Sequence, residues 1–227
     1  MRPLTFDIVD FHAHILPCAD HGSDSVETTL WQLASAAACG VKRIFATPHF
    51  YPNSHTVESF LRTRDEAYRK LSEALPVGMP QIKLGAEVLI CEGLENLPDL
   101  SRLFISGTST LLLELPFAGY REEYGDCVGI LTKRGVNVIM AHAERYPSTY
   151  SESMIKNGAS LQVNSRAIFK DKRARTWLER GVVSAIGTDI HMKDKRAYPK
   201  LVKAINKLGE YANTVKERSD AIWSEAL

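Results

Sequence analysis

Short apolar runs alternate with longer amphipathic segments along the chain. The runs predict seven β-strands, at Ile8–Phe11, Arg43–Thr47, Lys83–Val88, Thr110–Leu115, Asn137–Ala141, Ser160–Val163 and Val182–Gly187. Several runs are apolar on successive residues, as in Leu111–Leu113. Such runs are typical of parallel strands that are covered on both faces. The pattern therefore predicts an α/β protein built from repeated strand–helix units.

Helix start and stop signals fall between the predicted strands. Asp24, with Glu27 three residues later, predicts the start of a helix over Val26–Cys39, which Gly40 ends. Thr56 predicts the N-cap of a charged helix that ends at Leu75, before Pro76. Further helices are predicted over Tyr124–Arg134, Tyr150–Asn157, Arg166–Arg180 and Tyr198–Leu208. Because no repeat, low-complexity tract or linker interrupts the pattern, we expect a single domain over residues 1–227.

Composition and charge argue against two classes of partner. Lys and Arg number 28 against 27 Asp and Glu, so the chain has no excess of positive charge for binding a nucleic-acid backbone. Met1–Asp10 contains no sustained apolar run, and no later stretch reaches membrane-spanning length. We therefore expect no signal peptide, no membrane insertion and a cytoplasmic location.

The cysteines argue against thiol chemistry. Cysteine-dependent phosphatases need an Arg six positions after the nucleophile, and none of the four cysteines has one. They are Cys18, Cys39, Cys91 and Cys127, and they form no C-x-x-C pair. The chain also lacks the G-K pair of a nucleotide-binding loop and the G-x-S-x-G motif of a nucleophilic serine. These exclusions leave metal chemistry.

Residues that bind metals follow most of the predicted strands. The first strand runs into Asp10-Phe11-His12-Ala13-His14, and residues two apart on a strand face the same side, so His12 and His14 can share one ion. Other strands lead into His49, Glu87, Glu114, His142, Asp189 and His191. The carboxyl ends of parallel strands open onto one face of a barrel, so we expect these side chains to converge there.

The placement of histidines and acids strengthens this interpretation. Of the seven histidines, all except His55 lie at predicted strand ends or in the adjoining Asp20-His21 loop. Glu114 follows three leucines, where an unpaired carboxylate is costly, so a metal or a basic side chain must satisfy it. Imidazole and carboxylate ligands without thiolate suit zinc, manganese or iron better than calcium. The many candidate ligands predict two or three ions that share bridging groups and clamp a phosphoryl group.

These motifs resemble the polymerase and histidinol phosphatase (PHP) superfamily, and within it the bacterial capsule-type tyrosine phosphatases that act on exopolysaccharide tyrosine kinases. The resemblance covers nearly the whole chain. Its most specific segments are Ala46–His49, Gly85–Glu87, Ala141–Arg145, Gln162–Ser165 and Asp189–His191. It implies a distorted (β/α)7 TIM-like barrel and divalent or trivalent ions, for which we expect manganese, with iron or zinc as alternatives.

The resemblance also implies a ligand set for each of three ions. The first set is His12, His14, Glu87 and Asp189. Glu87 would bridge to a second ion, which Glu114 and His142 also bind. The third ion would take His49, His191 and an acidic residue from the loop after the first strand. That loop usually reads Asp-Asp-Gly in the family, whereas this chain has Asp20-His21-Gly22, so either Asp20 or His21 completes the third site.

The resemblance finally implies a reaction. Arg145 and Arg196 match the phosphate-holding arginines of the family, and forked guanidinium groups suit phosphate oxygens. The expected activity is hydrolysis of phosphotyrosine by a metal-activated hydroxide, on a protein such as the tail of a bacterial tyrosine kinase. We expect the segments Phe50–Glu58 and Phe117–Tyr124 to line the entrance and to select the substrate.

Three alternatives remain open from the sequence. A small-molecule phosphate monoesterase, similar to a histidinol phosphatase, fits the same scaffold because fold and metals do not determine the leaving group. A metal amidohydrolase also begins with H-x-H, but it normally has eight strands and often a carboxylated Lys ligand. A non-catalytic regulator that binds a kinase tail is suggested by the altered Asp20-His21 loop.

Overall fold

The computed structural model describes residues 7–227. The argument against a signal peptide used Met1–Asp10, and residues 1–6 of that segment lie outside the described residues. The strands are β1 (Ile8–Ala13), β2 (Val41–Ala46), β3 (His49–Phe50), β4 (Gln81–Leu84), β5 (Glu87–Leu89), β6 (Thr110–Glu114), β7 (Asn137–Met140), β8 (Ser160–Asn164) and β9 (Val183–Gly187). They form two parallel sheets, with the orders β1-β2-β4 and β3-β5-β6-β7-β8-β9.

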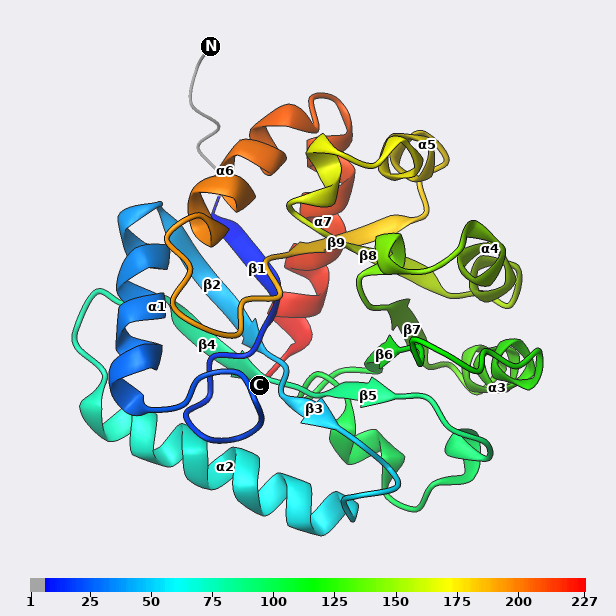
Figure 1. The fold of residues 1–227 in the computed structure, drawn as a ribbon, viewed down its shortest axis with the longest axis horizontal. Helices are drawn as coiled ribbons and strands as arrows, with labels where there is room; N and C mark the ends of the chain where they lie inside the picture. The colour runs from blue at the N-terminus through cyan, green and yellow to red at the C-terminus, as the bar shows by residue number, and fades with distance from the viewer. Residues whose placement is uncertain (1–6) are drawn as a thin grey trace.

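Helices surround the two sheets (Figure 1). They are α1 (Val26–Ala38), α2 (Val57–Ala74), α3 (Glu123–Lys133), α4 (Ser148–Lys156), α5 (Lys172–Glu179), α6 (Ala197–Lys207) and α7 (Tyr211–Glu225). Short 3-10 turns also occur, at η1 (Leu94–Asn96), η2 (Leu100–Leu103), η3 (Ala143–Arg145) and η4 (Ala167–Phe169). The predicted α/β class with parallel strands is confirmed.

The helix caps agree with the sequence in one case and differ in another. Thr56 caps α2 as predicted, in a capping box that it shares with Ser59. The N-cap of α1 is Ser25 rather than Asp24, because the Ser25 hydroxyl accepts the hydrogen bond from the Thr28 amide. Asp24 instead accepts a hydrogen bond from the hydroxyl of Thr28.

The predicted strand Lys83–Val88 is divided between the two sheets, as β4 and β5. The break falls at Gly85, where an added Cβ would lie 2.5 Å from the terminal methyl of Ile105, so a larger residue here would require the Ile105 side chain to move. After the break the Glu87 amide donates to the Pro48 carbonyl at 3.0 Å. Pro48 likewise separates β2 from β3. The break places Glu87 at the start of a strand rather than near the end of one.

Backbone contacts also join β1 to the segment after β9. The His14 amide donates to the Ile190 carbonyl at 2.9 Å, and the Asp189 amide donates to the His12 carbonyl at 2.8 Å. Ala13 and Ile190 form an isolated parallel bridge. Strand ladders alone thus give two parallel sheets rather than one closed barrel.

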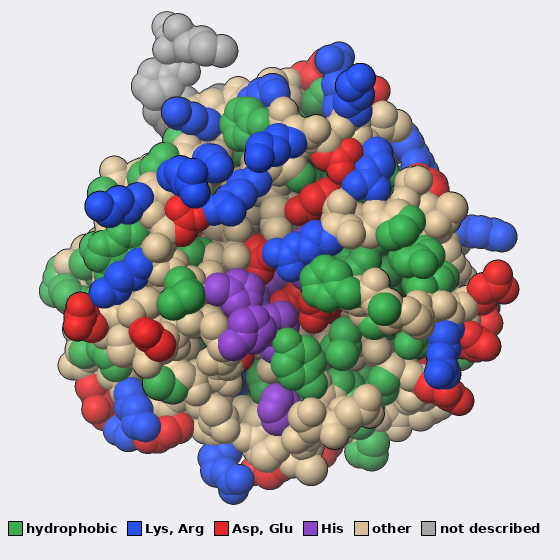
Figure 2. Space-filling model, in the orientation of Figure 1, with side chains coloured by type: hydrophobic (Ala, Val, Ile, Leu, Met, Phe, Trp, Pro, Cys, Tyr) green, Lys and Arg blue, Asp and Glu red, His purple; other side chains and the backbone are tan. Residues whose placement is uncertain are grey.

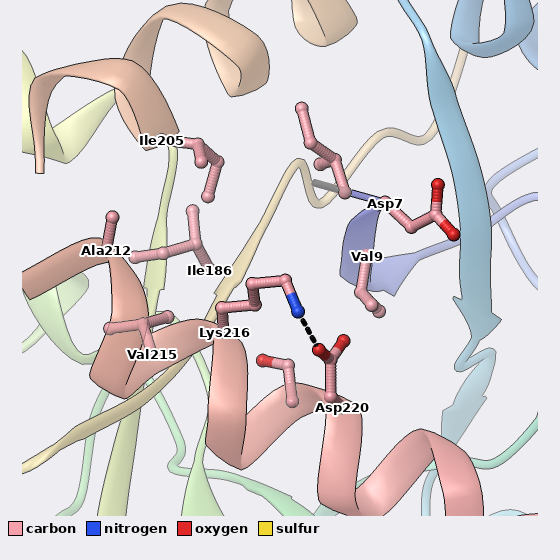
Figure 3. Close-up of a pocket in the computed structure, with 10 residues that line it drawn as sticks. Asp7, Val9, Ile186, Ile205, Ala212, Val215, Lys216 and Asp220 are labelled. Carbon is pink, nitrogen blue, oxygen red and sulfur yellow. Dashed lines mark hydrogen bonds and ion pairs between the residues drawn. The ribbon is translucent and has the colours of Figure 1, made fainter. Parts of the chain in front are cut away.

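The helix α7, which the sequence did not predict, closes the end of the sheets opposite the strand carboxyl ends. Its Trp223 ring packs on Phe45, with centroids 5.0 Å apart, and Phe45 packs on Phe11 at 4.9 Å. These side chains belong to a small buried cluster enclosed by the strands. A cavity of about 30 Å³, room for about one water molecule, lies between α7, α6 and the strands β1 and β9. Figure 3 shows the side chains that line it. The other end of the strands remains free for a site.

Candidate metal centre

The candidate ligands converge where β1, β6, β7 and β9 end and where the short strands β3 and β5 begin. His12 and His14 come from β1 and the residue after it, His49 from β3, Glu87 from β5 and Glu114 from β6. His142 follows β7, and Asp189 and His191 follow β9. All are buried except His191, which is partly exposed. Histidine side chains accordingly gather in a hollow of the surface in Figure 2.

The carboxylate of Glu87 lies at the centre of this cluster. Its Oε2 atom is 3.1 Å from His12 Nε2, 3.2 Å from His14 Nε2 and 3.0 Å from His49 Nδ1. Its Oε1 atom is 2.7 Å from His142 Nε2. One buried carboxylate is therefore shared by four imidazole rings.

Three groups of donor atoms have the spacing of metal ligands, with all atoms of a group within 4.8 Å of one another. They are His12, His14 and Glu87; His49, Glu87 and Glu114; and His14, His49 and His191. Glu87, His14 and His49 each belong to two groups. Residues that belong to two ligand groups can bridge neighbouring ions and hold them close together.

The donor set fits divalent cations on two observations. His12 Nε2 and His14 Nε2 face each other at 3.0 Å, and a single cation can satisfy both lone pairs. Buried atoms of His49 (Nδ1), Glu87 (Oε2) and Asp189 (Oδ1) lie 3.0–3.5 Å from an oppositely charged neighbour, but none of these contacts among the described residues has the geometry of a hydrogen bond. Because buried polar atoms without partners are rare and costly, a bound ion is the natural partner for them.

Charge and burial oppose each other in this cluster. Burial disfavours the protonated ring of His142, but contacts with Glu114 and Glu87 outweigh it and raise the pKa of His142 to about 9. Burial likewise raises the pKa of Glu87, yet His12, His14 and His142 hold it well below its usual value. The centre is thus built around an ionised carboxylate that needs positive charge beside it.

A second layer of polar side chains orients these rings. Gln162 Oε1 lies 3.1 Å from His12 Nδ1 and accepts the His142 amide at 2.6 Å. The Gln162 side-chain amide donates to Asn164 at 3.0 Å, and Asn164 in turn donates to Asp189 at 3.1 Å. Sequence analysis singled out the Gln162–Ser165 motif without assigning these roles. The available signal was that two polar residues two positions apart, Gln162 and Asn164, lie at the end of a predicted strand.

Asp10 is another residue whose role the sequence analysis missed. Its carboxylate accepts hydrogen bonds from the Thr188 amide at 2.8 Å and from the Thr188 hydroxyl at 2.6 Å. Asp189, which follows Thr188, has a positive backbone φ of 53°, which is uncommon for a residue other than glycine. Asp10 thus holds the strained loop that presents Asp189.

Asp20 and His21 make different kinds of contact in the site. Asp20 Oδ2 lies 2.6 Å from His14 Nδ1 and accepts the His49 amide at 2.9 Å. Its other oxygen accepts the Gly22 amide at 2.8 Å. The His21 ring instead stacks on His49, with centroids 4.7 Å apart, and is 4.8 Å from the ring of His191. His21 thus lies beside the rings of His49 and His191, whereas the Asp20 carboxylate contacts the His14 ring and the His49 amide.

The two candidate phosphate-holding arginines differ in position. Arg145 donates to the carboxylate of Asp189 and lines a groove of about 410 Å³ that also contains His191. The Arg196 side chain is 77% exposed, and its Nε atom lies 3.8 Å from Asp194 Oδ1. The structure brings Arg145 to the candidate ligands but does not bring Arg196 into contact with them.

Aromatic side chains border the site. Tyr51 stacks on His49, with centroids 5.1 Å apart, and Tyr146 lies 5.7 Å from the ring of His142. Phe117 is 75% exposed and its ring is 6.3 Å from that of Tyr146. The two segments expected to line the entrance thus contribute Tyr51 and Phe117.

Parallel strands with histidines and carboxylates at their carboxyl ends define an α/β protein whose site is able to hold metal ions. The chain matches the model of the family described as capsular polysaccharide synthesis, CpsB/CapC, over residues 8–222. It belongs to that family, which confirms the family resemblance seen in the sequence.

Known relatives cover most of the chain. The tyrosine-protein phosphatase CpsB of Streptococcus pneumoniae is 27% identical over an alignment of 213 residues, and the match covers 83% of this chain and 85% of the relative. The enzyme of the same name from Streptococcus agalactiae serotype III is 23% identical over 211 residues, with the same coverage.

A solved structure has the same fold. It comes from the crystal structures of YwqE from Bacillus subtilis and CpsB from Streptococcus pneumoniae, described as metal-dependent tyrosine phosphatases. Its TM-score is 0.78 at 22% identity, and the match covers 97% of this chain and 96% of the other. In the part of this chain that the structure describes, no helix combines the length and apolar character needed to cross a membrane.

Proposed function

We propose that this protein is a metal-dependent protein tyrosine phosphatase. The single observation that carries the proposal is the buried Glu87 carboxylate, shared by four imidazoles at 2.7–3.2 Å. Arg145 lies beside this centre, where its guanidinium group can face a phosphate. The curated relatives, which are named tyrosine-protein phosphatases, support the same activity.

The proposed ligand sets follow the contacts of the candidate residues. The first ion would take His12, His14, Glu87 and Asp189, and the second would take Glu87, Glu114 and His142. The third would take His49 and His191, with His21, whose ring stacks on His49, as the added ligand. We propose that Asp20 orients His14 from behind, since its oxygens already accept hydrogen bonds. Bound ions, manganese first and iron or zinc as alternatives, would supply Lewis-acid charge neutralisation and activation of water.

The chain's own residues bind and orient the substrate. The Arg145 fork holds non-bridging phosphate oxygens, and Asp189 keeps the guanidinium group in position. Arg196 adds a second contact to the phosphate by rotation of its exposed side chain. Tyr51 and Phe117 flank the aryl ring of the phosphotyrosine, which favours an aromatic ester over an aliphatic one.

The finer parts of the proposal concern the scaffold and the partner. A distorted (β/α)7 barrel in one domain, residues 1–227, is supported by the continuation of β2 and β4 into β3 and β5 and by the bridge from Ala13 to Ile190. The expected substrate is a phosphotyrosine-bearing protein in the cytoplasm, such as the tail of a bacterial tyrosine kinase.

The test compares a phosphotyrosine peptide with a small aliphatic phosphate ester, using protein loaded with manganese. We expect cleavage that favours the peptide, stops with a chelator and falls at least about 100-fold in Arg145→Ala. Arg175→Ala, which removes an exposed arginine paired with Glu179, is the matched control and should keep full activity. Preference for the aliphatic ester would indicate a metabolic phosphatase instead, and metal binding without turnover would indicate a regulator.

A further inference from the structure

Five basic side chains form what we call the basic rim, on one side of the candidate metal centre. Figure 2 shows Lys and Arg side chains gathered beside the histidine-lined hollow, on the side where Figure 1 places α6. The members come from the residues on either side of η4, and from α6 and the loop that precedes it. They are Arg166, Lys170, Lys195, Arg196 and Lys200.

The basic rim is continuous with the groove that contains Arg145. Arg166 and Asp194 line the same groove as Asp189 and Arg145. Arg166 donates to Asp194, which also lies within 3.8 Å of the guanidinium group of Arg196. One carboxylate therefore serves two guanidinium groups at the mouth of the groove.

The remaining members of the rim are lysines outside the ion pairs that the described part of the chain forms. Within residues 7–227, no carboxylate lies at ion-pair distance from Lys170, Lys195 or Lys200. Desolvation, together with the positive charges of Arg166, Arg196 and Lys170, lowers the pKa of Lys200. Because the chain's formal net charge is only +1, this excess of positive charge is local to the rim.

We propose that the basic rim binds acidic side chains that flank the phosphotyrosine in the substrate polypeptide. The inference rests on the proposed phosphatase function and adds the class of sequence that this site prefers. A peptide whose phosphate reaches Arg145 lies in the groove next to Arg166, and Arg166 and Lys200 are close enough for their charges to interact, so flanking acidic residues on that side come within reach of the rim. Unpaired lysines beside a reaction groove attract anionic residues and raise the rate of productive encounter.

The test uses the double variant Lys195→Ala/Lys200→Ala and three substrates. These are a phosphotyrosine peptide with Glu and Asp on both sides, the same peptide with Gln and Asn in their place, and phenyl phosphate. We expect the wild-type protein to prefer the acidic peptide. The double variant should lose about 3- to 30-fold in kcat/KM for that peptide and should keep its activity toward phenyl phosphate. Because salt screens charges, the difference in kcat/KM between the double variant and the wild-type protein should shrink as salt is added.

Lys133→Ala/Lys156→Ala is the matched control. It removes two exposed lysines from the last turns of α3 and α4, on another flank of the molecule, and should leave all three substrates unaffected. Equal kcat/KM for the acidic and neutral peptides, or an equal loss in the two double variants, would refute the role of the rim. If the rim lysines were needed for sedimentation with vesicles of anionic phospholipid but not for peptide cleavage, the rim would be a lipid-binding surface instead.

The failure of this inference is distinguishable from failure of the proposed function. Cleavage of phenyl phosphate by the metal-loaded wild-type protein tests the phosphatase function independently of the rim. An active enzyme without preference for the acidic peptide would overturn only the inference about the rim.

Discussion

Glu87 is the side chain on which most of the candidate ligands depend. Replacing it by Gln keeps the shape but removes the negative charge that faces His12, His14 and His142. We expect Glu87→Gln to lose at least one bound ion per chain and at least about 100-fold in activity. Even residues that only hydrogen-bond to metal ligands typically change metal affinity or activity about 10–100-fold when they are mutated. Metal content after gel filtration, measured by mass spectrometry, and peptide cleavage check this prediction.

Glu92→Gln is the control for this change. Glu92 is exposed and pairs with Arg121 on the surface, so neutralising it should alter neither metal content nor activity. Full metal occupancy in Glu87→Gln would contradict the central role of this carboxylate.

Gln162 acts on the metal centre without belonging to the ligand sets. Its side chain contacts His12, the His142 amide and Asn164, all of which are buried. We expect Gln162→Ala to lower metal affinity roughly 10- to 100-fold and to destabilise the fold by about 1–3 kcal/mol, because it leaves these groups unpaired. Metal titration and urea unfolding measure the two effects.

The exposed Gln81 on β4 provides the comparison for Gln162. Gln81→Ala should leave metal affinity and stability nearly unchanged. If Gln162→Ala bound metal as tightly as the wild-type protein, the hydrogen bonds of Gln162 would have no part in orienting the ligands.

At the scale of elements, α7 stabilises the fold from the end opposite the metal centre. Trp223 is 7% exposed, packs on Phe45, and has the Lys83 ammonium group 5.0 Å from its ring centroid. We expect Trp223→Ala to reduce the free energy of unfolding by about 3–5 kcal/mol, since it leaves a large cavity. Urea denaturation followed by circular dichroism measures this loss.

Val77→Ala is a suitable control for Trp223→Ala. Val77 is 103% exposed in a loop, so its truncation should change stability by less than about 0.5 kcal/mol. A similarly small effect of Trp223→Ala would show that α7 contributes little to the core.

Other elements show where sequence patterns are reliable and where they fail. The start of α2 at Thr56 was predicted because its signals are local hydrogen bonds between neighbouring residues. The predicted helix Arg166–Arg180 is instead divided into η4 and α5, because Asp171 caps a new helix start. The division of Lys83–Val88 depends on the approach of Ile105, which is distant in sequence.

At the scale of the whole molecule, bound metal should stabilise the fold. The ligands come from strands and loops distributed over most of the chain, so the complete centre exists only in the folded state. With free manganese at 100 times its dissociation constant, we expect about 2.7 kcal/mol of added stability, or roughly 5–10 °C in Tm. Thermal unfolding with manganese and with a chelator makes the comparison, and an equal Tm in both conditions would contradict it.

The sequence alone determined the class of fold, the family and the residue types of the site. Alternating strands and helices follow from local periodicity, and motifs such as Ala141–Arg145 are contiguous in the chain. The convergence of His12, Glu87 and His142 was also predictable, because parallel strands present their carboxyl ends on one face.

Only the tertiary structure decided which side chains contact one another. It placed the His21 ring beside His49 and the Asp20 carboxylate beside His14, contacts that the Asp20-His21 sequence does not specify. It also separated Arg145 from the exposed Arg196. These outcomes depend on side-chain directions across residues far apart in sequence, and such directions are set by packing and hydrogen bonds rather than by local pattern.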